Sequence, residues 1–298
     1  MSAEKFLVTG ATGQTGHDTV QRLVEKGHAV RALVHREDER SEALRGTGAE
    51  VVVGDLLEHD DAIRATAGTN AAYFCYPIRP GLIQATAYFA DAAKRAGLEA
   101  VVNLSQISAR GDSKSHAARD HWIAERVFDW SGVPVVHLRP TFFAQWLLYP
   151  FSRATIVEEG IIDLPYGEGR HAPIAAEDQA RLIAAMLAEP AAHLGKTYTL
   201  HGPIELDQAG IAAAVSEVLG RTITYRPLTI PQYRERLEKA GLPEILIQHF
   251  CAIALDYQNG IFAGEDKIIA AVTGQRPMTV QEFVTLHRNA FTAASAAA

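Results

Sequence analysis

Apolar and polar residues alternate with two different periods along the first half of the chain. Six short apolar runs have the length of buried strands, and apolar residues recur every three or four positions in most of the segments between them. The predicted strands are 6–8, 29–34, 50–53, 71–76, 100–104 and 133–138, and the predicted helices are 15–26, 41–45, 60–67, 82–96 and 118–130. Strands that alternate with helices predict an α/β fold with a doubly wound parallel sheet.

The pattern changes after about residue 155, where proline and glycine interrupt it more often. A loop-rich stretch at 161–173 precedes a helix predicted at 177–188 and a strand predicted at 196–200. The remaining predictions are the helices 206–219, 231–240, 244–259 and 280–290 and the strand 222–227. We therefore expect residues 1–155 to form one domain. Residues 156–298 would form a smaller α/β domain that covers the substrate, with the segment 174–200 returning to the first.

The turn after the first apolar run is rich in glycine. Gly10 and Gly13 would let backbone N–H groups approach a pyrophosphate, and Gly16 would let the following helix pack closely on the sheet. A strand precedes this turn, and a helix and a second strand follow it, which argues against a merely flexible turn. The sequence predicts a Rossmann-type dinucleotide site. The residues of the turn expected to bind the cofactor are Gly10, Thr12, Gly13, Gln14, Thr15 and Gly16.

The residue after the second strand bears on which dinucleotide binds. A guanidinium there can clamp a 2′-phosphate, so Arg36 favours NADP(H), although NAD(H) is not excluded. Glu37 and Asp38 lie beside Arg36, and the alternative is an ordinary surface arginine. Asp55, after the third strand, either accepts a hydrogen bond from the adenine amino group or forms a turn.

Ligands of open α/β sheets bind outside the carboxyl ends of the strands. The residues that follow strands four to six there are Tyr76, Pro77, Ser105, Gln106, Phe142, Phe143 and Trp146, with Tyr149 further along. We expect Tyr76 and Pro77 beside the cofactor and Gln106 with the aromatic residues beside the substrate. The aromatic residues predict a small, flat, largely apolar substrate, or they form the core between the two domains.

Reduction of a simple carbonyl needs a proton donor, usually a tyrosine whose acidity a nearby lysine raises. No tyrosine lies between Ser105 and Trp130, and Lys114 precedes the helix that would carry the pair. That helix instead offers His121, one turn before Glu125. His121 donates a proton, orients the nicotinamide ribose or bonds a substrate oxygen, or else it is a structural histidine paired with Glu125. Ser105 and His121 are the candidate catalytic residues.

Composition narrows the classes of partner. There are 28 Lys and Arg against 35 Asp and Glu, and a formal net charge of −7 argues against nucleic acid. No apolar run has membrane-spanning length and the N-terminus offers no signal peptide, so we expect a cytoplasmic protein without a membrane partner. Cys75 and Cys251 lie far apart, and His116 and His121 are five residues apart, so no metal site is expected. A monomer and a homodimer both remain open.

Several blocks of the chain carry a resemblance to a known family. They are residues 10–16, 30–36, 54–56, 131–134 and 138–140, and the match extends through 166–169 to Pro173, Ile174 and Asp178. The chain resembles the NmrA-like family of atypical short-chain dehydrogenase/reductases, and within it the bacterial quinone reductase and triphenylmethane reductase subgroup. The resemblance also places Tyr166 in the substrate pocket.

The resemblance implies a reductase that uses NAD(P)H, with NADP(H) preferred, to reduce a conjugated acceptor such as a quinone, an enone or a dye. The positions of the superfamily's catalytic lysine and tyrosine are occupied here by His121 and Ala117. Because both catalytic side chains are absent, ordinary alcohol dehydrogenase activity is not expected. The alternative is a redox sensor that binds NADP(H), turns nothing over and acts through a protein partner, as other members of the family do.

Overall fold

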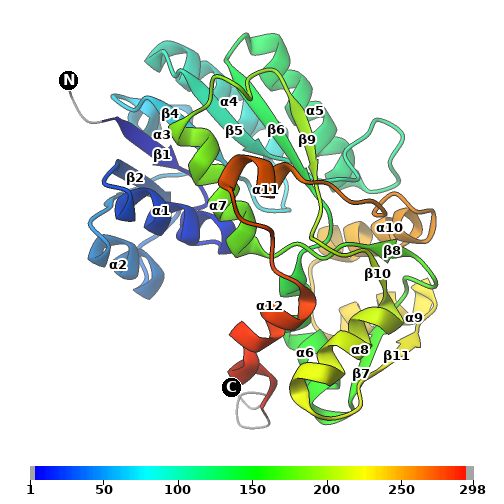
Figure 1. The fold of residues 1–298 in the computed structure, drawn as a ribbon. Helices are drawn as coiled ribbons and strands as arrows, with labels where there is room; N and C mark the ends of the chain where they lie inside the picture. The colour runs from blue at the N-terminus through cyan, green and yellow to red at the C-terminus, as the bar shows by residue number, and fades with distance from the viewer. Residues whose placement is uncertain (1–3, 293–298) are drawn as a thin grey trace.

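A seven-stranded parallel sheet forms the centre of the computed structural model, which describes residues 4–292. Its strand order is β3-β2-β1-β4-β5-β6-β9 (Figure 1). The strands are β1 (Lys5–Val8), β2 (Ala29–Val34), β3 (Glu50–Val53), β4 (Ala71–Phe74), β5 (Ala100–Leu104), β6 (Val135–Pro140) and β9 (Thr197–Leu200). The order reverses between β1 and β4, which creates the switch point where doubly wound sheets bind ligands. The predicted fold class is confirmed.

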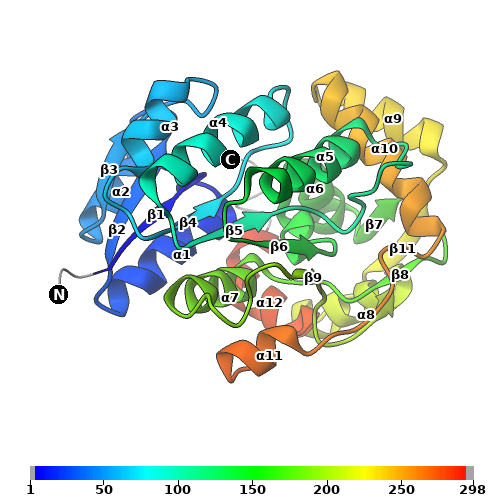
Figure 2. The same ribbon diagram turned by 90° about the horizontal axis from the view of Figure 1, so that it is seen from above.

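Helices cover both faces of the sheet, as Figure 2 shows from above. One face carries α3 (His59–Thr66), α4 (Leu82–Ala96) and α5 (His116–Ser131), and the other carries α1 (Gln14–Glu25), α2 (Glu39–Gly46), α7 (Ala176–Ala188) and α11 (Ile268–Thr273). Phe89 and Phe128 fill the first interface, while Val20, Leu44 and Leu182 fill the second. The central strands are therefore buried on both faces, which is why they read as continuous apolar runs.

The remaining elements form a smaller body below the sheet in Figure 1, beyond the carboxyl ends of its strands. They are η1 (Ala144–Leu148), α6 (Pro150–Glu158), β7 (Ile161–Leu164), β8 (Arg170–His171), β10 (Leu206–Asp207), α8 (Gln208–Leu219), β11 (Thr224–Pro227), α9 (Ile230–Lys239), α10 (Glu244–Gln258), α12 (Val280–Leu286) and η2 (Arg288–Phe291). β7 pairs with β11 and β8 pairs with β10. A separate apolar cluster that includes Ile211, Tyr233 and Phe283 holds these elements together.

Two later segments pack on the main sheet. Within 174–200, β9 pairs with β6 and α7 packs on α1. Helix α11 joins them, because Ile269 is buried in the same cluster as the sheet. The division of the chain at residue 155 stays a prediction, and its outer ends, 1–3 and 293–298, lie outside the described residues. In residues 4–292, no helix has the length and apolar character needed to cross a membrane.

Candidate functional site

The glycine turn between β1 and α1 is closely packed. Gly10 has a φ of +57°, a conformation that costs glycine little, and its carbonyl accepts a hydrogen bond from the N–H of Gly13 (2.9 Å). A Cβ atom on Gly16 would lie 2.2 Å from the carbonyl oxygen of Gly10 and 2.9 Å from the Cα of Ala11. Gly16 thus lets the first turn of α1 contact the backbone of the loop directly.

The N-terminus of α1 is suited to an anion. Its N-cap residue is Gly13, which has no side chain to bond the first N–H groups, and the first turn contains no acidic residue. The partial positive charge of the helix end therefore faces the loop without a neutralising side chain. The side chain of Thr15 is not available to a ligand, because its hydroxyl bonds the Tyr73 hydroxyl (2.8 Å) in the core. The turn thus fits a pyrophosphate through its backbone.

A cleft of about 270 Å³ runs along the carboxyl ends of β1 to β4. It is lined by six of the residues predicted to bind the cofactor, namely Gly10, Thr12, Gly13, Asp55, Tyr76 and Pro77. Asp55 forms the turn that was one of its two expected roles, because its Oδ1 accepts the N–H of Leu57 (2.9 Å), and Asp55 also lines the cleft. The cleft has the location that an adenosine moiety takes in this type of fold.

Two arginines, Arg40 and Arg79, line this cleft, and neither is the one expected from the sequence. The Arg36 side chain is 77% exposed and does not line the cleft, whereas Arg40, the second residue of α2, does. Asp38 fixes the Arg40 guanidinium, since its carboxylate accepts from Nε (3.1 Å) and Nη2 (2.6 Å). Arg40 thus lies four positions beyond the arginine expected from the sequence, in the first turn of α2.

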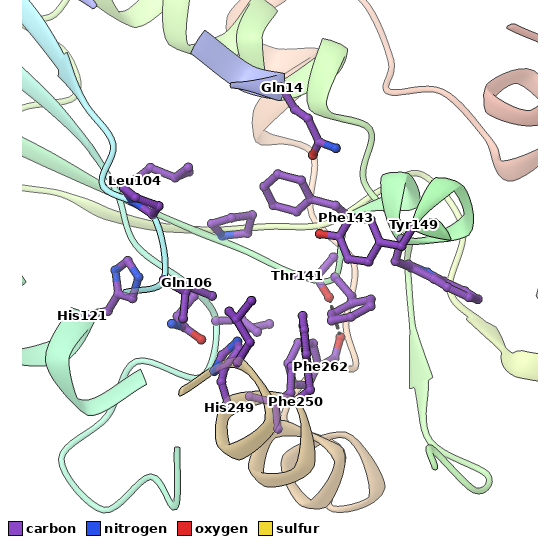
Figure 3. A pocket seen from close by; sticks show the side chains of 18 of the residues that line it. Gln14, Leu104, Gln106, His121, Thr141, Phe143, Tyr149, His249, Phe250 and Phe262 are labelled. Carbon is purple, nitrogen blue, oxygen red and sulfur yellow. Dashed lines mark hydrogen bonds between the residues drawn. The ribbon is translucent and has the colours of Figure 1, made fainter. Parts of the chain in front are cut away.

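A larger cavity of about 650 Å³, shown in Figure 3, adjoins the cleft. Tyr76 and Pro77 line both. Gln14 lies at one end of this cavity. The other predicted residues that line it are Ser105, Gln106, His121, Phe142, Phe143, Trp146 and Tyr149. Phe142 also packs against Tyr166 (ring centroids 5.6 Å apart) and Phe262 (6.1 Å), so it is both a lining and a core residue.

Tyr166 does not line this cavity. Its ring stacks on Tyr257, with centroids 4.2 Å apart and planes 11° apart, and it has no exposed surface. The ring therefore belongs to the core of the smaller body, behind Phe142. In place of Tyr166, the cavity is lined by His249 and Phe250 from α10, together with Phe262. These residues are not predicted from the sequence, in which the only signal for them is a histidine within an apolar helix.

The cavity is almost free of charge. Its lining contains no Asp, Glu, Lys or Arg among the residues that the structure describes. Aromatic and aliphatic side chains from η1, α6 and α10 face the ends of β4, β5 and β6 across it. An ionic group would have to leave water without a partner here, which is costly, so the cavity favours an uncharged ligand.

Ser105 belongs to a buried ionic network. Its hydroxyl donates to Oε1 of Glu125 (2.5 Å), and the fully buried Glu125 carboxylate also accepts from Nε of Arg139 (2.8 Å) and from its Nη2. The carboxylate raises the pKa of Arg139. Glu125 therefore bonds Ser105 and Arg139, and not His121 as the structural interpretation of that histidine requires. Because the Ser105 O–H group already donates to Glu125, Ser105 offers the cavity only its oxygen as an acceptor.

Two uncharged imidazoles face the cavity. Burial lowers the pKa of His121 to about 4 and that of His249 to about 3, so both rings are neutral near pH 7. His249 is oriented by its Nδ1, which lies 2.8 Å from the Ser115 hydroxyl at the start of α5. The imidazole ring of His121 has no hydrogen-bond partner among the described residues. Each ring can bond a ligand, but neither carries a proton to give as an imidazolium.

Comparison with known proteins places the chain in a family. The model of the NmrA-like family matches residues 2–284. The chain belongs to the NmrA-like family. The resemblance inferred from the glycine turn and the later sequence blocks is thereby confirmed.

Relatives of this NmrA-like chain include reductases. It is 32% identical over 291 residues to the NAD(P)H azoreductase of Xenophilus azovorans. The aligned region covers 97% of this chain and 100% of the azoreductase. The NADPH-dependent quinone oxidoreductase of Escherichia coli, solved with NADPH, has a TM-score of 0.84 and 25% identity, covering 95% of this chain and 100% of that one. The triphenylmethane reductase of Citrobacter sp., solved with NADP(H), has a TM-score of 0.83 and 25% identity, covering 94% and 99%.

Proposed function

We propose that this NmrA-like protein is an NAD(P)H-dependent reductase, with NADP(H) preferred, that transfers hydride to an uncharged conjugated acceptor such as a quinone. The names of its relatives support a reductase, because they describe an azoreductase, a quinone oxidoreductase and a triphenylmethane reductase. The observation that carries the choice of acceptor is the uncharged aromatic cavity that opens from the cleft. The bound cofactor supplies the hydride.

The residues of the chain then act mainly by positioning. The backbone of Gly10 and Gly13 and the N-terminus of α1 hold the pyrophosphate, and Asp55 accepts from the adenine. Phe142 and Phe143 hold a flat acceptor and exclude water, which brings the reacting atoms together. A conjugated acceptor spreads the charge that it gains, so the missing tyrosine and lysine pair matters less than for a simple ketone. His121 and Ser105 are proposed to orient the nicotinamide ribose.

The acceptor preference is tested with NADPH and a panel of three acceptors: 1,4-naphthoquinone, a sulfonated azo dye and a cationic triphenylmethane dye. We expect kcat/KM for the quinone to exceed that for each ionic dye by at least about tenfold, because about 1.4 kcal/mol of uncompensated desolvation suffices for that ratio. Loss of NADPH absorbance at 340 nm measures the rate. Equal rates for the ionic dyes would contradict the choice of acceptor.

The same assay, extended to an enone and an uncharged azo dye, addresses the non-catalytic alternative. A protein that binds NADPH, as shown by calorimetry, yet oxidises it with no quinone, enone or uncharged azo dye would not be a reductase. The sensor interpretation would then be favoured. Trace contamination by other reductases is excluded by a parallel preparation of a variant that does not bind the cofactor.

The NADP(H) preference is proposed to depend on Arg40, with Arg36 as a second cation. Arg40→Gln removes a guanidinium that lines the cleft, so we expect the Kd for NADPH to rise about tenfold, the lower end for a charge-assisted hydrogen bond, and the Kd for NADH to stay unchanged. Isothermal titration calorimetry gives both constants. Arg45→Gln is the matched control, because Arg45 lies on the same helix and pairs with Glu37 and Glu42 outside the cleft.

The outcome for Arg36 is read from the same titrations. If Arg36→Gln selectively weakens NADPH binding and Arg40→Gln does not, Arg36 and not Arg40 binds the 2′-phosphate. An unchanged ratio of the two dissociation constants in both variants would remove both arginines from the selection of the cofactor.

A further inference from the structure

Tyr149 occupies the turn between η1 and α6, and its position there is fixed by the backbone. Its carbonyl accepts the N–H groups of Ser152 (2.9 Å) and Arg153 (2.8 Å) at the start of α6, while its own N–H bonds the carbonyl of Trp146 (3.2 Å). The ring packs against Phe151, with centroids 5.8 Å apart. The side chain therefore leaves a well-defined turn and lines the large cavity.

The phenol of Tyr149 is a free donor. Its hydroxyl points into the cavity from the side opposite His121 (Figure 3), and it has no hydrogen-bond partner within residues 4–292. Burial raises the pKa of Tyr149, so that the hydroxyl is protonated at neutral pH. An acceptor in the cavity thus meets an unpaired O–H group on this wall.

The other hydroxyl groups of the lining already have partners. Ser105 donates to Glu125 (2.5 Å), Thr141 donates to the carbonyl of Phe262 (3.2 Å), and Tyr76 donates to the carbonyl of Pro80 (3.1 Å). The amide of Gln106 and the neutral imidazoles are much weaker acids than a phenol. Among the described residues, Tyr149 is therefore the one lining side chain whose phenol O–H has no acceptor in the protein.

We propose that Tyr149 donates the proton that completes reduction of the acceptor. This inference rests on the proposed reductase function and supplies the role for which α5 has no tyrosine. The acceptor gains a hydride with its electron pair from NADPH, which becomes NADP⁺. The O–H bond of Tyr149 breaks, a new O–H or N–H bond forms on the acceptor, and the tyrosinate regains a proton from water. The proton comes from the smaller body, across the cavity from the sheet.

The test is Tyr149→Phe, which removes one oxygen and keeps the ring. We expect kcat with 1,4-naphthoquinone to fall about 100-fold at saturating NADPH, the lower end for general acid catalysis. The matched control is Tyr198→Phe on β9, whose hydroxyl bonds His193 (3.1 Å) and does not line the cavity. We expect its kcat to stay within twofold of the wild type.

A second readout needs no turnover. Quenching of tryptophan fluorescence, to which Trp146 in the cavity wall contributes, gives the Kd of 1,4-naphthoquinone for the cofactor-free protein. Loss of one hydrogen bond predicts an approximately threefold to tenfold weaker Kd in Tyr149→Phe. The Kd of 1,4-dimethylnaphthalene, which has the same shape and no oxygen, is expected not to change.

The two proposals fail in different ways. If the wild type oxidises no NADPH with any acceptor, the reductase function fails, and proton donation fails with it. If the wild type is active and Tyr149→Phe keeps its kcat, the inference about Tyr149 is overturned and the reductase function stands. A weaker quinone Kd with an unchanged kcat would make Tyr149 a binding residue and also overturn proton donation.

Discussion

Gly16→Ala is expected to weaken NADPH binding severely. The new Cβ atom would lie 2.2 Å from the carbonyl oxygen of Gly10, 2.8 Å from its carbonyl carbon and 2.9 Å from Cα of Ala11. All three are backbone atoms, so α1 and the loop must move apart. The N–H groups that would hold the pyrophosphate then lose their geometry. Loss of two charge-assisted hydrogen bonds at about 1.5–3 kcal/mol each predicts a Kd at least about 100-fold higher.

The measurement is calorimetric titration with NADPH, accompanied by the thermal midpoint of unfolding without cofactor. The control is Gly46→Ala, the same substitution in α2, where the added Cβ has no atom within 4 Å and the φ of the residue is not positive. We expect this control to bind NADPH normally. A Gly16→Ala protein that unfolds like the wild type and binds NADPH with unchanged Kd would show that the turn is not the pyrophosphate site.

The main sheet was predictable from sequence because its strands are buried on both faces. Runs such as Ala71–Phe74 are apolar throughout, and glycine or polar residues separate them from amphipathic helices. The two-residue strands β8 and β10 were missed since two residues carry no period. The sequence predicts a loop-rich stretch at 161–173, but this stretch contains β7, whose partner β11 lies about sixty residues later. Such pairing depends on tertiary contacts that local composition does not encode.

The predictions for the site were limited in the same way. The carboxyl-end rule identified residues such as Ser105 and Phe142, which the structure brings to one cavity. The helical spacing of four suggested a partner for His121 in Glu125, but the buried carboxylate bonds Arg139 on the neighbouring strand. The resemblance suggested Tyr166 for the pocket, and a core contact with Tyr257 takes that ring away from the cavity. The sequence therefore predicted which strand ends meet at the site, but neither the contribution of α10 nor which atoms pair there.

Glu125→Gln is expected to lower the free energy of unfolding by about 3 kcal/mol, the lower end for breaking a buried ion pair. The Glu125 side chain is fully buried and that of Arg139 is 25% exposed, so loss of the carboxylate charge leaves a poorly solvated guanidinium. The Ser105 hydroxyl also loses its charged acceptor. Urea unfolding followed by circular dichroism measures the change. Glu42→Gln is the control, because its ion pair with Arg45 is exposed and such pairs contribute at most about 1 kcal/mol.

The double variant Glu125→Met with Arg139→Met separates the energy of the pair from the cost of leaving one charge alone. Because apolar residues of similar volume replace a buried pair at little cost, we expect the double variant to be more stable than either single methionine variant. The coupling free energy from the double-mutant cycle should then exceed about 1 kcal/mol, as for residues in direct contact. Additive losses would mean that Glu125 and Arg139 stabilise the protein independently, with Glu125 acting mainly through Ser105.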